Sequence, residues 1–499
     1  MTNKGYILAI DQGTSSTKCL VFDAAGQVVV KSTSALHTDH YSNGFVEQDP
    51  EGIYRNVIEA VSATLDAFIH KGFKFADITC CGISNQRETF LLWDAWGRAV
   101  TPAVVWACKR STAICADLKE LGQEQLIRER TGLILDPYFS GTKLLWLIRH
   151  NNELKKRLDN GEIFFGTVDC WLLYRLTGGK RHRTDHTNAS RTLLFNIHTL
   201  SWDMEILKLW CLENLRLPEV YPSAFDYGES DFEGLFPHQL SITALIGDSH
   251  AAAFGEGCFD QGTGKVTMGT GSSILMNTGT LPIESKHGLL STICWSKKGR
   301  VDYALEGAIV ACGSTLEWLK NELNLYDDPR DTERMAQSVP DNAGVYLIPA
   351  FSGLGAPHWQ MNRRASIEGM TFGTTKNHIV RAALESIPYQ IKDVLEAIEQ
   401  DMGSPVQDIA VNGGIANNGF VIRFLADLLQ IKLKKRQNSD VSALGAAYMA
   451  GLQSGIYNGI NELKEINSQQ TTEVYPQSEN SAILEWYAGW RKYVNIRSI

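Results

Sequence analysis

Two aspartates stand at the ends of apolar segments, where they could take part in catalysis. Asp11 follows "YILAI" and precedes the tract "QGTSST", and Asp248 follows "ITALIG". Each could be an ordinary turn aspartate that accepts a backbone N–H. Alternatively, phosphoryl transfer to an alcohol needs one carboxylate to accept the hydroxyl proton and another to anchor Mg²⁺, usually through water. Two aspartates on separate halves of a cleft would meet both needs.

Three short glycine turns, each after an expected strand, could receive a phosphate. They are Gly13-Thr14, Gly269-Thr270-Gly271 and Gly413-Gly414. Glycine lets backbone N–H groups approach an anion closely, and successive N–H groups form an anion-binding nest. A plain β-turn is the alternative for any one of them. The sequence has no G-x-x-x-x-G-K-[ST] and no G-x-G-x-x-G between a strand and a helix, so it lacks both common nucleotide motifs.

The stretch "SNQRETF" places five consecutive polar residues directly after an apolar strand. Arg87 beside Glu88 offers donors and acceptors together, which suits a vicinal diol whose hydroxyls each need both. The alternative is a solvated loop with a surface ion pair. Trp106 and Tyr138 could wall a small polar site, although an aromatic side chain is more often part of a core.

The elements that would position these residues belong to an α/β protein. In the first half we expect strands at 6–11, 19–23, 27–32 and 78–85 and a hairpin over 89–100. Helices are expected over 50–70, 111–121 and 141–151. Strands that alternate with helices over roughly 240 residues indicate an α/β domain.

The second half repeats the opening pattern. "GKVTMGTGSSILMNTG" is again strand, glycine-threonine-serine turn and strand, which sets Met268–Ser273 beside Asp11–Ser16. A polar segment over 221–237 marks the expected junction, so we predict domains at 1–246 and 247–499 with one ligand between them. A helix over 377–401, a strand, glycine turn and helix over 409–429, and a small-residue helix around 443–453 complete the pattern.

The composition is that of a globular protein. Of 499 residues, 44% are hydrophobic and 21% charged, which favours two or three domains. A net charge of −9 argues against a broad nucleic-acid footprint. Ten cysteines without paired CxxC spacing predict buried, reduced thiols and a cytoplasmic location. No apolar stretch approaches the roughly 20 residues needed to cross a bilayer, and we expect neither membrane insertion nor a signal peptide.

Nine stretches in order resemble the FGGY carbohydrate-kinase family, closest to its glycerol kinases. They span nearly the whole chain: "AIDQGTSSTK", "GFVEQDP", "ISNQRET", "TDHTNASRTLLFNIHTLSWD", "MGTGSSILMNTG", "YALEGAI", "PAFSGLGAPHW", "RAALESIPYQIKDVLEA" and "ALGAAYMAGL". The resemblance implies two RNase H-like, actin-type ATPase domains with a catalytic cleft between them. It also implies that ATP, with Mg²⁺, donates its γ-phosphoryl group to a terminal hydroxyl of a small polyol or sugar, and that the chain forms a homodimer or homotetramer.

The resemblance also assigns roles residue by residue. Asp248 would be the general base, and Asp11 would orient Mg²⁺. Lys18 stands where these glycerol kinases usually have arginine, which exchanges a forked donor for a point charge. The positions matched to polyol binding are Arg87, Glu88, Trp106, Tyr138, Asp248, Ser249 and Ser273. Those matched to the nucleotide and its phosphates are Thr14, Ser15, Ser16, Lys18, Thr270, Gly313, Gly414 and Asn418.

Three departures fall where the substrate is decided. Glycerol kinases usually have glutamine at Ser249, phenylalanine at Ser273 and glutamine at Ala107. Smaller side chains predict room for extra hydroxylated carbons. A kinase for a larger polyol or ketose, such as erythritol, a pentitol, xylulose or ribulose, is therefore an alternative to a glycerol kinase. A non-catalytic actin-like nucleotide-binding protein is a second alternative, against which Asp248 argues because a scaffold needs no proton acceptor.

Overall fold

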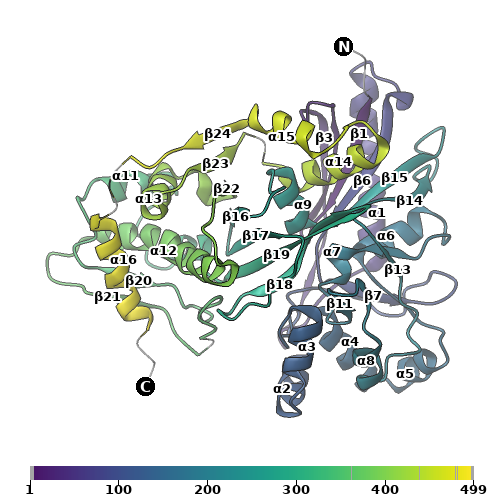
Figure 1. Cartoon of the computed structure of the whole chain (residues 1–499), viewed down its shortest axis with the longest axis horizontal. Helices are drawn as coiled ribbons and strands as arrows, with labels where there is room; N and C mark the ends of the chain where they lie inside the picture. Colours follow the sequence, from purple (N-terminus) through teal and green to yellow (C-terminus); the bar gives the residue numbers. More distant parts are fainter. Residues whose placement is uncertain (1–4, 361, 438, 478, 480, 496–499) are drawn as a thin grey trace.

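The structure is a computed structural model that describes residues 5–360, 362–437, 439–477, 479 and 481–495. Its main sheet has 13 strands in the order β24-β23-β22-β16-β17-β19-β18-β14-β15-β6-β1-β2-β3 and runs through both halves of the chain (Figure 1). Helices pack on the sheet in both halves, as expected for an α/β protein.

The N-terminal half contributes five neighbouring strands in the order β3-β2-β1-β6-β15. Strands β1 (Tyr6–Gln12), β2 (Ser16–Phe22) and β3 (Val28–Ala35) form an antiparallel meander. Strand β6 (Ile78–Asn85) lies parallel to β1, and β15 (Leu240–Gly247) lies parallel to β6. The predicted strands are confirmed, and Asp11 and Asn85 lie near the carboxyl ends of parallel neighbours.

The C-terminal half repeats this order and these directions as β19-β17-β16-β22-β23. Strands β16 (Thr263–Met268), β17 (Ser272–Gly279) and β19 (Arg300–Ile309) are antiparallel neighbours. Strands β22 (Asp408–Asn412) and β23 (Leu433–Arg436) follow in parallel. The predicted repeat of strand, turn and strand is confirmed, while the division between residues 246 and 247 stays a prediction.

The two five-stranded units join through two further strands. Strand β14 (Ala224–Ser230) pairs with β15, and strand β18 (Leu290–Lys297) pairs with β19. They meet each other at the single pair Ala224 and Lys297. Strand β14 lies within the polar segment expected at the junction, so this segment is part of the sheet and not a free linker.

Helix α1 (Pro50–His70) shows how local sequence sets an element. Asp49 accepts hydrogen bonds from the N–H groups of Glu51 and Gly52, and proline occupies the first turn, where its missing N–H costs nothing. One face of the helix buries apolar residues at helical spacing against β2 and β3, namely Ile53, Val57, Ala60, Val61, Leu65 and Phe68.

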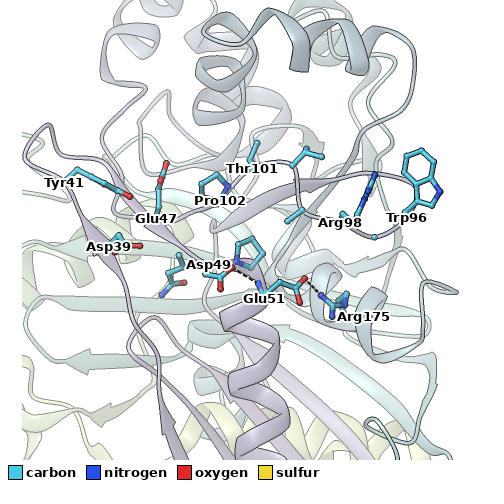
Figure 2. A pocket seen from close by; sticks show the side chains of 15 residues that line it. Asp39, Tyr41, Glu47, Asp49, Glu51, Trp96, Arg98, Thr101, Pro102 and Arg175 are labelled. Atoms are coloured by element: carbon cyan, nitrogen blue, oxygen red, sulfur yellow. Dashed lines mark hydrogen bonds and ion pairs between the residues drawn. The ribbon is translucent and has the colours of Figure 1, made fainter.

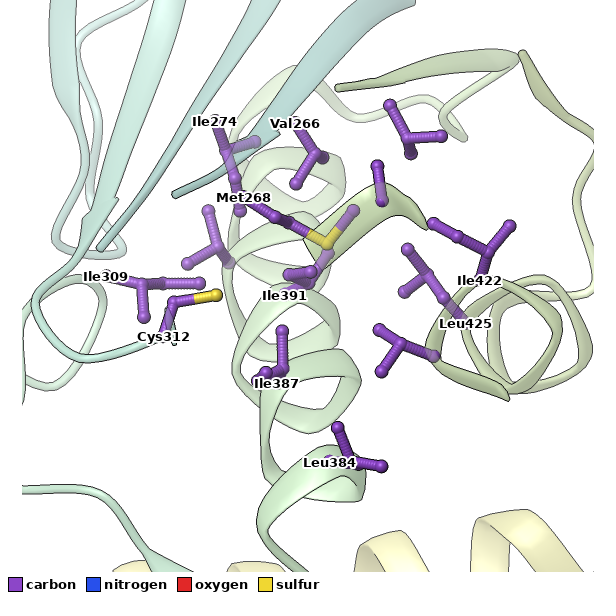
Figure 3. Packing of buried hydrophobic residues seen from close by; sticks show 14 of the residues in the cluster. Val266, Met268, Ile274, Ile309, Cys312, Leu384, Ile387, Ile391, Ile422 and Leu425 are labelled. Carbon is purple, nitrogen blue, oxygen red and sulfur yellow. The ribbon is translucent and has the colours of Figure 1, made fainter. Parts of the chain in front are cut away.

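The core of the C-terminal half holds one face of the β16–β17 hairpin. Figure 3 shows Val266, Met268 and Ile274 of the hairpin beside helix α12 (Lys376–Met402), from which Ile387 and Ile391 point toward them. Helix α13 (Gly419–Leu429) closes the other side of this cluster. Because side chains alternate along a strand, Lys265 and Thr267 lie on the opposite face of the sheet.

Two small-residue helices pack closely on that opposite face. Helix α9 (Asp248–Gly255) lies against α14 (Val441–Ser454), and α14 also packs on β6 and β1 of the N-terminal half. A Cβ added at Gly445 would lie 1.8 Å from the carbonyl oxygen of Ala251, so only glycine permits this approach. The predicted close-packing helix is confirmed, and it holds the helix that begins at Asp248.

A second sheet of five strands extends the N-terminal half, in the order β4-β5-β8-β7-β9. The predicted hairpin is confirmed, since β7 pairs with β8 and Trp93 bridges Ala99. These strands are β4 (Asp39–His40), β5 (Val46–Gln48), β7 (Phe90–Trp93), β8 (Ala103–Val104) and β9 (Phe164–Thr167). Helices α2 (Thr112–Glu120), α3 (Glu124–Thr131), α4 (Ser140–Arg149) and α5 (Asn152–Asp159) lie beside them.

The remaining elements are shorter or peripheral. In the N-terminal half they are α6 (Val168–Leu176), β10 (Arg183–Asp185), α7 (His186–Ala189), β11 (Phe195–Asn196), β12 (Ser201–Trp202), α8 (Met204–Leu209) and β13 (Glu219–Tyr221). In the C-terminal half they are α10 (Gly313–Asn321), α11 (Asp331–Gln337), β20 (Tyr346–Ile348), β21 (Ser366–Glu368), α15 (Ile460–Ser468), β24 (Thr471–Val474) and α16 (Ser481–Val494). Short 3₁₀ turns lie at Phe75–Asp77 and Gly414–Asn417.

Two expectations from composition can be compared with the structure. All ten cysteines are free thiols and nine are buried, but Cys211 is exposed, which corrects the expectation that every thiol is buried. Cys211 follows the short helix α8 on the surface and has a φ of 55°. In the part of the chain that the structure describes, no helix is both long and apolar enough to span a bilayer.

Candidate active site

A cavity of about 1040 Å³ is lined by residues from both halves of the chain. It brings together five of the residues predicted from the sequence: Arg87, Asp248, Ser249, Ser273 and Gly414. Its other lining residues are Ala252, Lys265, Thr267, Val411, Asn412, Gly413, Ala416, Asn417, Lys435, Arg436, Gln437, Ser439, Val441, Ser442 and Thr472. The carboxyl ends of β6, β15 and β22 therefore supply or immediately precede several of the polar groups.

Asp248 is the first residue of α9 and lies on the wall of this cavity. Its Oδ1 lies 3.3 Å from Nε of Arg87 and accepts the N–H of Ser249 at 2.6 Å. Its Oδ2 has no hydrogen-bond partner among the described residues, and 38% of the side chain is exposed. The carboxylate is thus held on one side and available to a ligand on the other.

Arg87 belongs to a buried chain of alternating charges. Its two terminal nitrogens donate to both oxygens of Glu306 at 3.2 and 3.0 Å. Arg191 lies 2.6 Å from Glu306 and donates to Glu88 at 2.6 Å. These ion-paired side chains join the two halves in the order Asp248, Arg87, Glu306, Arg191 and Glu88.

Burial of this chain shows that the alternative of a surface ion pair at Arg87 and Glu88 is wrong. The side chains of Arg87 and Glu306 are 5% exposed, and those of Arg191 and Glu88 only 1%. Burial raises the pKa of Glu88, and the two arginines oppose that shift. Burial by itself would raise the pKa of Glu306 as well, but the charges of Arg191 and Arg87 outweigh it and hold that pKa well below its ordinary value. Glu306 is therefore charged at any physiological pH.

The backbone at Glu88 adopts an uncommon conformation for a residue with a side chain. Its φ is 59°, in the left-handed region. The N–H of Thr89 donates to the carbonyl of Arg87 at 2.7 Å, and the hydroxyl of Ser140 donates to the carbonyl of Glu88 at 2.8 Å. Such strain persists where surrounding contacts determine the conformation, and it often marks a functional site.

Asp11 lies at the end of β1 and accepts a hydrogen bond from the hydroxyl of Ser84 at 3.0 Å. Burial raises the pKa of Asp11 to about 6; Lys18 opposes this shift and the charge of Asp248 adds to it. Asp11 and Asp248 are therefore close enough to interact. Within the described residues, no group of three or more His, Cys, Asp or Glu side chains forms a metal cage. One carboxylate still fits Mg²⁺, which is usually held by one or two carboxylates together with phosphate oxygens and water.

The first glycine turn is tied down on both sides. The N–H of Gly13 donates to the carbonyl of Ser16, and Gln48 donates to the carbonyl of Thr14 at 2.7 Å. The hydroxyl of Thr14 accepts the indole N–H of Trp106 at 2.9 Å. Ser15 is exposed and Ser16 is half-buried. This turn could therefore present Thr14 and the two serines to a phosphate.

Lys18, on β2 after this turn, pairs across to the other half of the chain. Its Nζ lies 3.3 Å from Asp440, which precedes α14, and Lys31 lies 2.8 Å from the same carboxylate. The side chain of Lys18 is 36% exposed. The structure therefore engages Lys18 with protein, and a phosphate would compete with Asp440 for it.

The nucleotide positions of the second half fall into two groups. The first group is Thr270 and Gly313: the N–H of Gly313 donates to the carbonyl of Gly269 at 2.9 Å, and the carbonyl of Thr270 accepts the N–H of Cys312 at 2.9 Å. The second group is Gly414 and Asn418, at the two ends of the 3₁₀ turn that precedes α13. Gly414 lines the cavity, but Thr270, Gly313 and Asn418 are not among its lining residues. Asn418 caps α13, with its side chain bonded to Val421 and Thr332.

Trp106 and Tyr138 lie against each other, with ring centroids 5.7 Å apart in an edge-on arrangement. Trp106 is 37% exposed. Burial raises the pKa of Tyr138, and the nearby charge of Glu88 adds to the shift. The two rings are thus beside the buried charges, where they could form one wall of a small site.

Several polar residues of the site were not predicted from the sequence. Thr267 is paired in register with Ser273 on one side and Asn412 on the other, so three polar side chains form a row across β17, β16 and β22. Lys265 is 2% exposed and donates to Thr267 at 2.9 Å. Burial lowers the pKa of Lys265, and the charge of Glu256 opposes this shift. The alternation "KVT" is the signal that could have placed Lys265 and Thr267 on one face.

A second cavity, of about 890 Å³, lies in the N-terminal half. Figure 2 shows that one of its carboxylates, Glu51, pairs with Arg175. A second carboxylate, Asp49, lies 3.3 Å from Arg55. Its wall includes Gln48, which holds the Thr14 turn. This cavity therefore lies behind the first glycine turn and contains neither Asp11 nor Asp248.

Comparisons with known proteins agree on one family. The model of the N-terminal domain of the FGGY family of carbohydrate kinases matches residues 6–255, and that of its C-terminal domain matches residues 264–454. The chain is 45% identical to a glycerol kinase of Pseudomonas putida over 99% of this chain and 97% of that one. It is 43% identical to a glycerol kinase of Alkaliphilus oremlandii over 99% and 97% of the two chains.

Solved structures extend the likeness to three dimensions. The crystal structure of Plasmodium falciparum glycerol kinase with ADP has a TM-score of 0.93 at 33% identity, covering 99% of both chains. A xylulose kinase from Lactobacillus acidophilus has a TM-score of 0.87 at 21% identity, covering 98% of both chains. The second likeness shows the shared two-domain fold alone.

We predict that Glu306→Gln destabilises the protein strongly. The change leaves Arg87 and Arg191 buried without their shared carboxylate, and breaking a buried pair costs about 3–5 kcal/mol. Chemical denaturation would measure the loss in the free energy of unfolding. Asp328→Asn, at an exposed pair with Arg330, is the matched control and should leave stability unchanged. If Glu306→Gln lowered the free energy of unfolding by less than about 1 kcal/mol, the scale of a surface ion pair, the buried network of charges would not be essential to the fold.

Proposed function

The chain belongs to the FGGY family of carbohydrate kinases, and from this we propose that it transfers the γ-phosphoryl group of ATP to a terminal hydroxyl of a small polyol, with glycerol as the first candidate. It is an ATP-dependent kinase with a glycerol kinase-like sequence along its whole length. The observation that supports the catalytic assignment best is Asp248, held by Arg87 and partly exposed in the cavity shared by both halves.

Asp248 would act as the general base. The acceptor hydroxyl must lose its proton as the new P–O bond forms, and a carboxylate within hydrogen-bond reach can take it. Arg87 fixes the orientation of that carboxylate, and Glu306 fixes Arg87 in turn. Phosphoryl transfer depends mainly on positioning and on charge neutralisation, so this rigid support matches the needs of the reaction.

The polyol would lie between Asp248 and the residues around Glu88. Arg87 and Glu88 supply a donor and an acceptor, and Trp106 with Tyr138 supplies an apolar wall. This pairing suits an alcohol that carries hydroxyls along one edge and C–H groups along the other. Ser249 and Ser273 would complete the site beside Asp248.

The phosphates would meet the glycine turns and the basic residues of the cleft. Backbone N–H groups of the turns at Gly13, Thr270 and Gly414 can form anion-binding nests. Lys18 lies on β2 just after the first glycine turn and Lys265 lines the cavity, so both would neutralise phosphate charge. Asp11 would hold Mg²⁺, which when bound neutralises the oxygens of the β- and γ-phosphates. Gly313 and Asn418 would shape the nucleotide end of the site through the backbone and the start of α13.

One observation favours a second candidate, a kinase for a longer polyol or a ketose. The hydroxyls of Ser249 and Ser273 lie 3.3 Å apart on the cavity wall beside Asp248. Two hydroxyls there can bind further hydroxyl groups of a substrate, whereas an apolar side chain could only pack against carbon. Four- and five-carbon substrates such as erythritol, pentitols, xylulose and ribulose would use them. A non-catalytic nucleotide-binding protein would gain nothing from a half-exposed base beside a buried arginine.

We further propose a cytoplasmic location and assembly as a homodimer or homotetramer. Ten free thiols suit a reducing compartment in which ATP is also abundant. Sedimentation velocity of the purified protein would give the oligomeric state directly.

We predict that Asp248→Asn lowers kcat by about 10²–10⁴-fold, the usual contribution of a general base. The variant should still bind ATP, because the nucleotide positions are untouched. ADP release measured over a panel of polyols and ketoses would test both the base and the substrate class. Asp260→Asn, at an exposed pair with Lys464, is the matched control. Full activity of the Asp248 variant would mean that another group accepts the proton.

We predict that Ser273→Phe shifts preference toward glycerol. A buried phenylalanine adds apolar contact worth about 1–3 kcal/mol for a three-carbon ligand and fills the space that longer substrates need. Steady-state kinetics should show glycerol KM falling about tenfold or more while kcat/KM for erythritol and pentitols falls. Ser468→Phe, at an exposed position, serves as control. If the unmodified protein already prefers glycerol over every longer substrate, the larger-pocket alternative is refuted and the family assignment stands.

A further inference from the structure

Lys143 is a fully buried lysine whose ammonium group is bonded to three backbone carbonyls. Its Nζ donates to the carbonyls of Tyr138 at 2.8 Å, Trp106 at 3.1 Å and Val105 at 3.3 Å. An ammonium has three N–H donors, so all three are used. Lys143 lies on α4, and its relative exposure is 0%.

The three carbonyls come from two separate loops. Val105 and Trp106 follow strand β8, whereas Tyr138 precedes helix α4 by two residues. Within the described part of the chain, the carbonyls of Trp106 and Tyr138 have no hydrogen-bond donor other than Lys143, while Val105 also accepts the N–H of Cys108. Lys143 is therefore the polar tie between the loops that carry the two aromatic rings.

The aromatic side chains that these two loops carry, Trp106 and Tyr138, contact each other. The rings of Trp106 and Tyr138 lie edge-on at 5.7 Å, and the indole N–H of Trp106 reaches the hydroxyl of Thr14 at 2.9 Å. The same helix contacts the carbonyl of Glu88 through Ser140. A shift of either loop would therefore move the aromatic wall relative to Glu88 and to the first glycine turn.

Stability alone gives a weak reason for a lysine at this position. No carboxylate lies within ion-pair distance of Lys143 among the described residues, and burying an ammonium without one is costly. Burial lowers the pKa of Lys143 to about 7, against which the charge of Glu88 acts. An apolar residue of similar volume would fill the space more cheaply but could not bond the loops.

We infer that Lys143 is a positioning residue, which fixes Trp106 and Tyr138 as the aromatic wall of the polyol site through their backbone carbonyls. The inference rests on the proposed function, in which these two side chains line that site. Lys143 itself touches no substrate, so its effect should appear in the binding of the polyol and not in the binding of ATP.

The test is Lys143→Met, which keeps the length of the side chain and removes all three donors. We expect KM for the polyol to rise about tenfold or more, because small misplacements of positioning groups are costly, while KM for ATP stays within about twofold. Lys71→Met is the matched control, since Lys71 also bonds a backbone carbonyl, that of Val29 at 2.7 Å, but is exposed and remote from the aromatic wall. That control should leave both KM values unchanged.

Lys143→Gln, which retains two N–H donors, should fall between the original protein and Lys143→Met, and it carries the test if the methionine variant does not fold. A folded variant with an unchanged KM for the polyol would overturn the inference, as would an equal rise in both KM values. Failure of both variants to fold would assign Lys143 to folding alone and overturn it as well. Failure of the proposed function is distinguishable, because the unmodified protein would then phosphorylate no polyol.

Discussion

A network of five alternating charges between the two halves, four of them buried, is the constraint on which the site depends. Two arginines pair with three carboxylates, and Glu306 lies at the centre, where it accepts two hydrogen bonds from Arg87 and lies 2.6 Å from Arg191. Charges buried this deeply are tolerable only when each has its partners in good geometry. Arg87 and Glu306 come from opposite halves, so the requirement for pairing also sets how the halves meet. Among the five charged residues of this network, Asp248 is the one whose carboxylate is substantially exposed, and it lies on the wall of the cavity.

The duplicated sheet explains why polar groups gather at this place. Each half has the same order of five strands, and each begins with a hairpin whose glycine turn lies at the end of a strand. Helices α9 and α14 fill the space between the halves through contacts that only glycine and alanine permit, including the approach of Gly445 to Ala251. The position of Asp248 is thus determined twice, by close packing behind α9 and by Arg87 in front of it.

Much of the fold could be predicted from the sequence because its signals are local. Alternating apolar strands, the capping aspartate of α1 and the small residues of α14 each act over a few positions, and the glycine turns stand at strand ends.

The sequence marks the polar stretch at Arg87 and Glu88, but its burial could not be predicted, since it depends on Glu306 and Arg191, which lie more than a hundred residues away. Asn412 was missed because only the pairing of β22 with β16 places it beside Thr267, whereas Lys265 carries a local signal, the alternation "KVT". Lys143 lies on a predicted helix, yet its role becomes visible only when two loops converge on it.

The central claim is that the terminal hydroxyl of the acceptor gives its proton to Asp248 in the cleft between the halves. A crystal structure of the protein with a polyol and an unreactive ATP analogue tests it most directly. We expect a terminal oxygen of the polyol to lie about 2.6–3.2 Å from a carboxylate oxygen of Asp248, on the side away from Arg87, with the γ-phosphate analogue in line behind it. A polyol bound elsewhere, or one whose terminal hydroxyl faces a different base, would contradict the account.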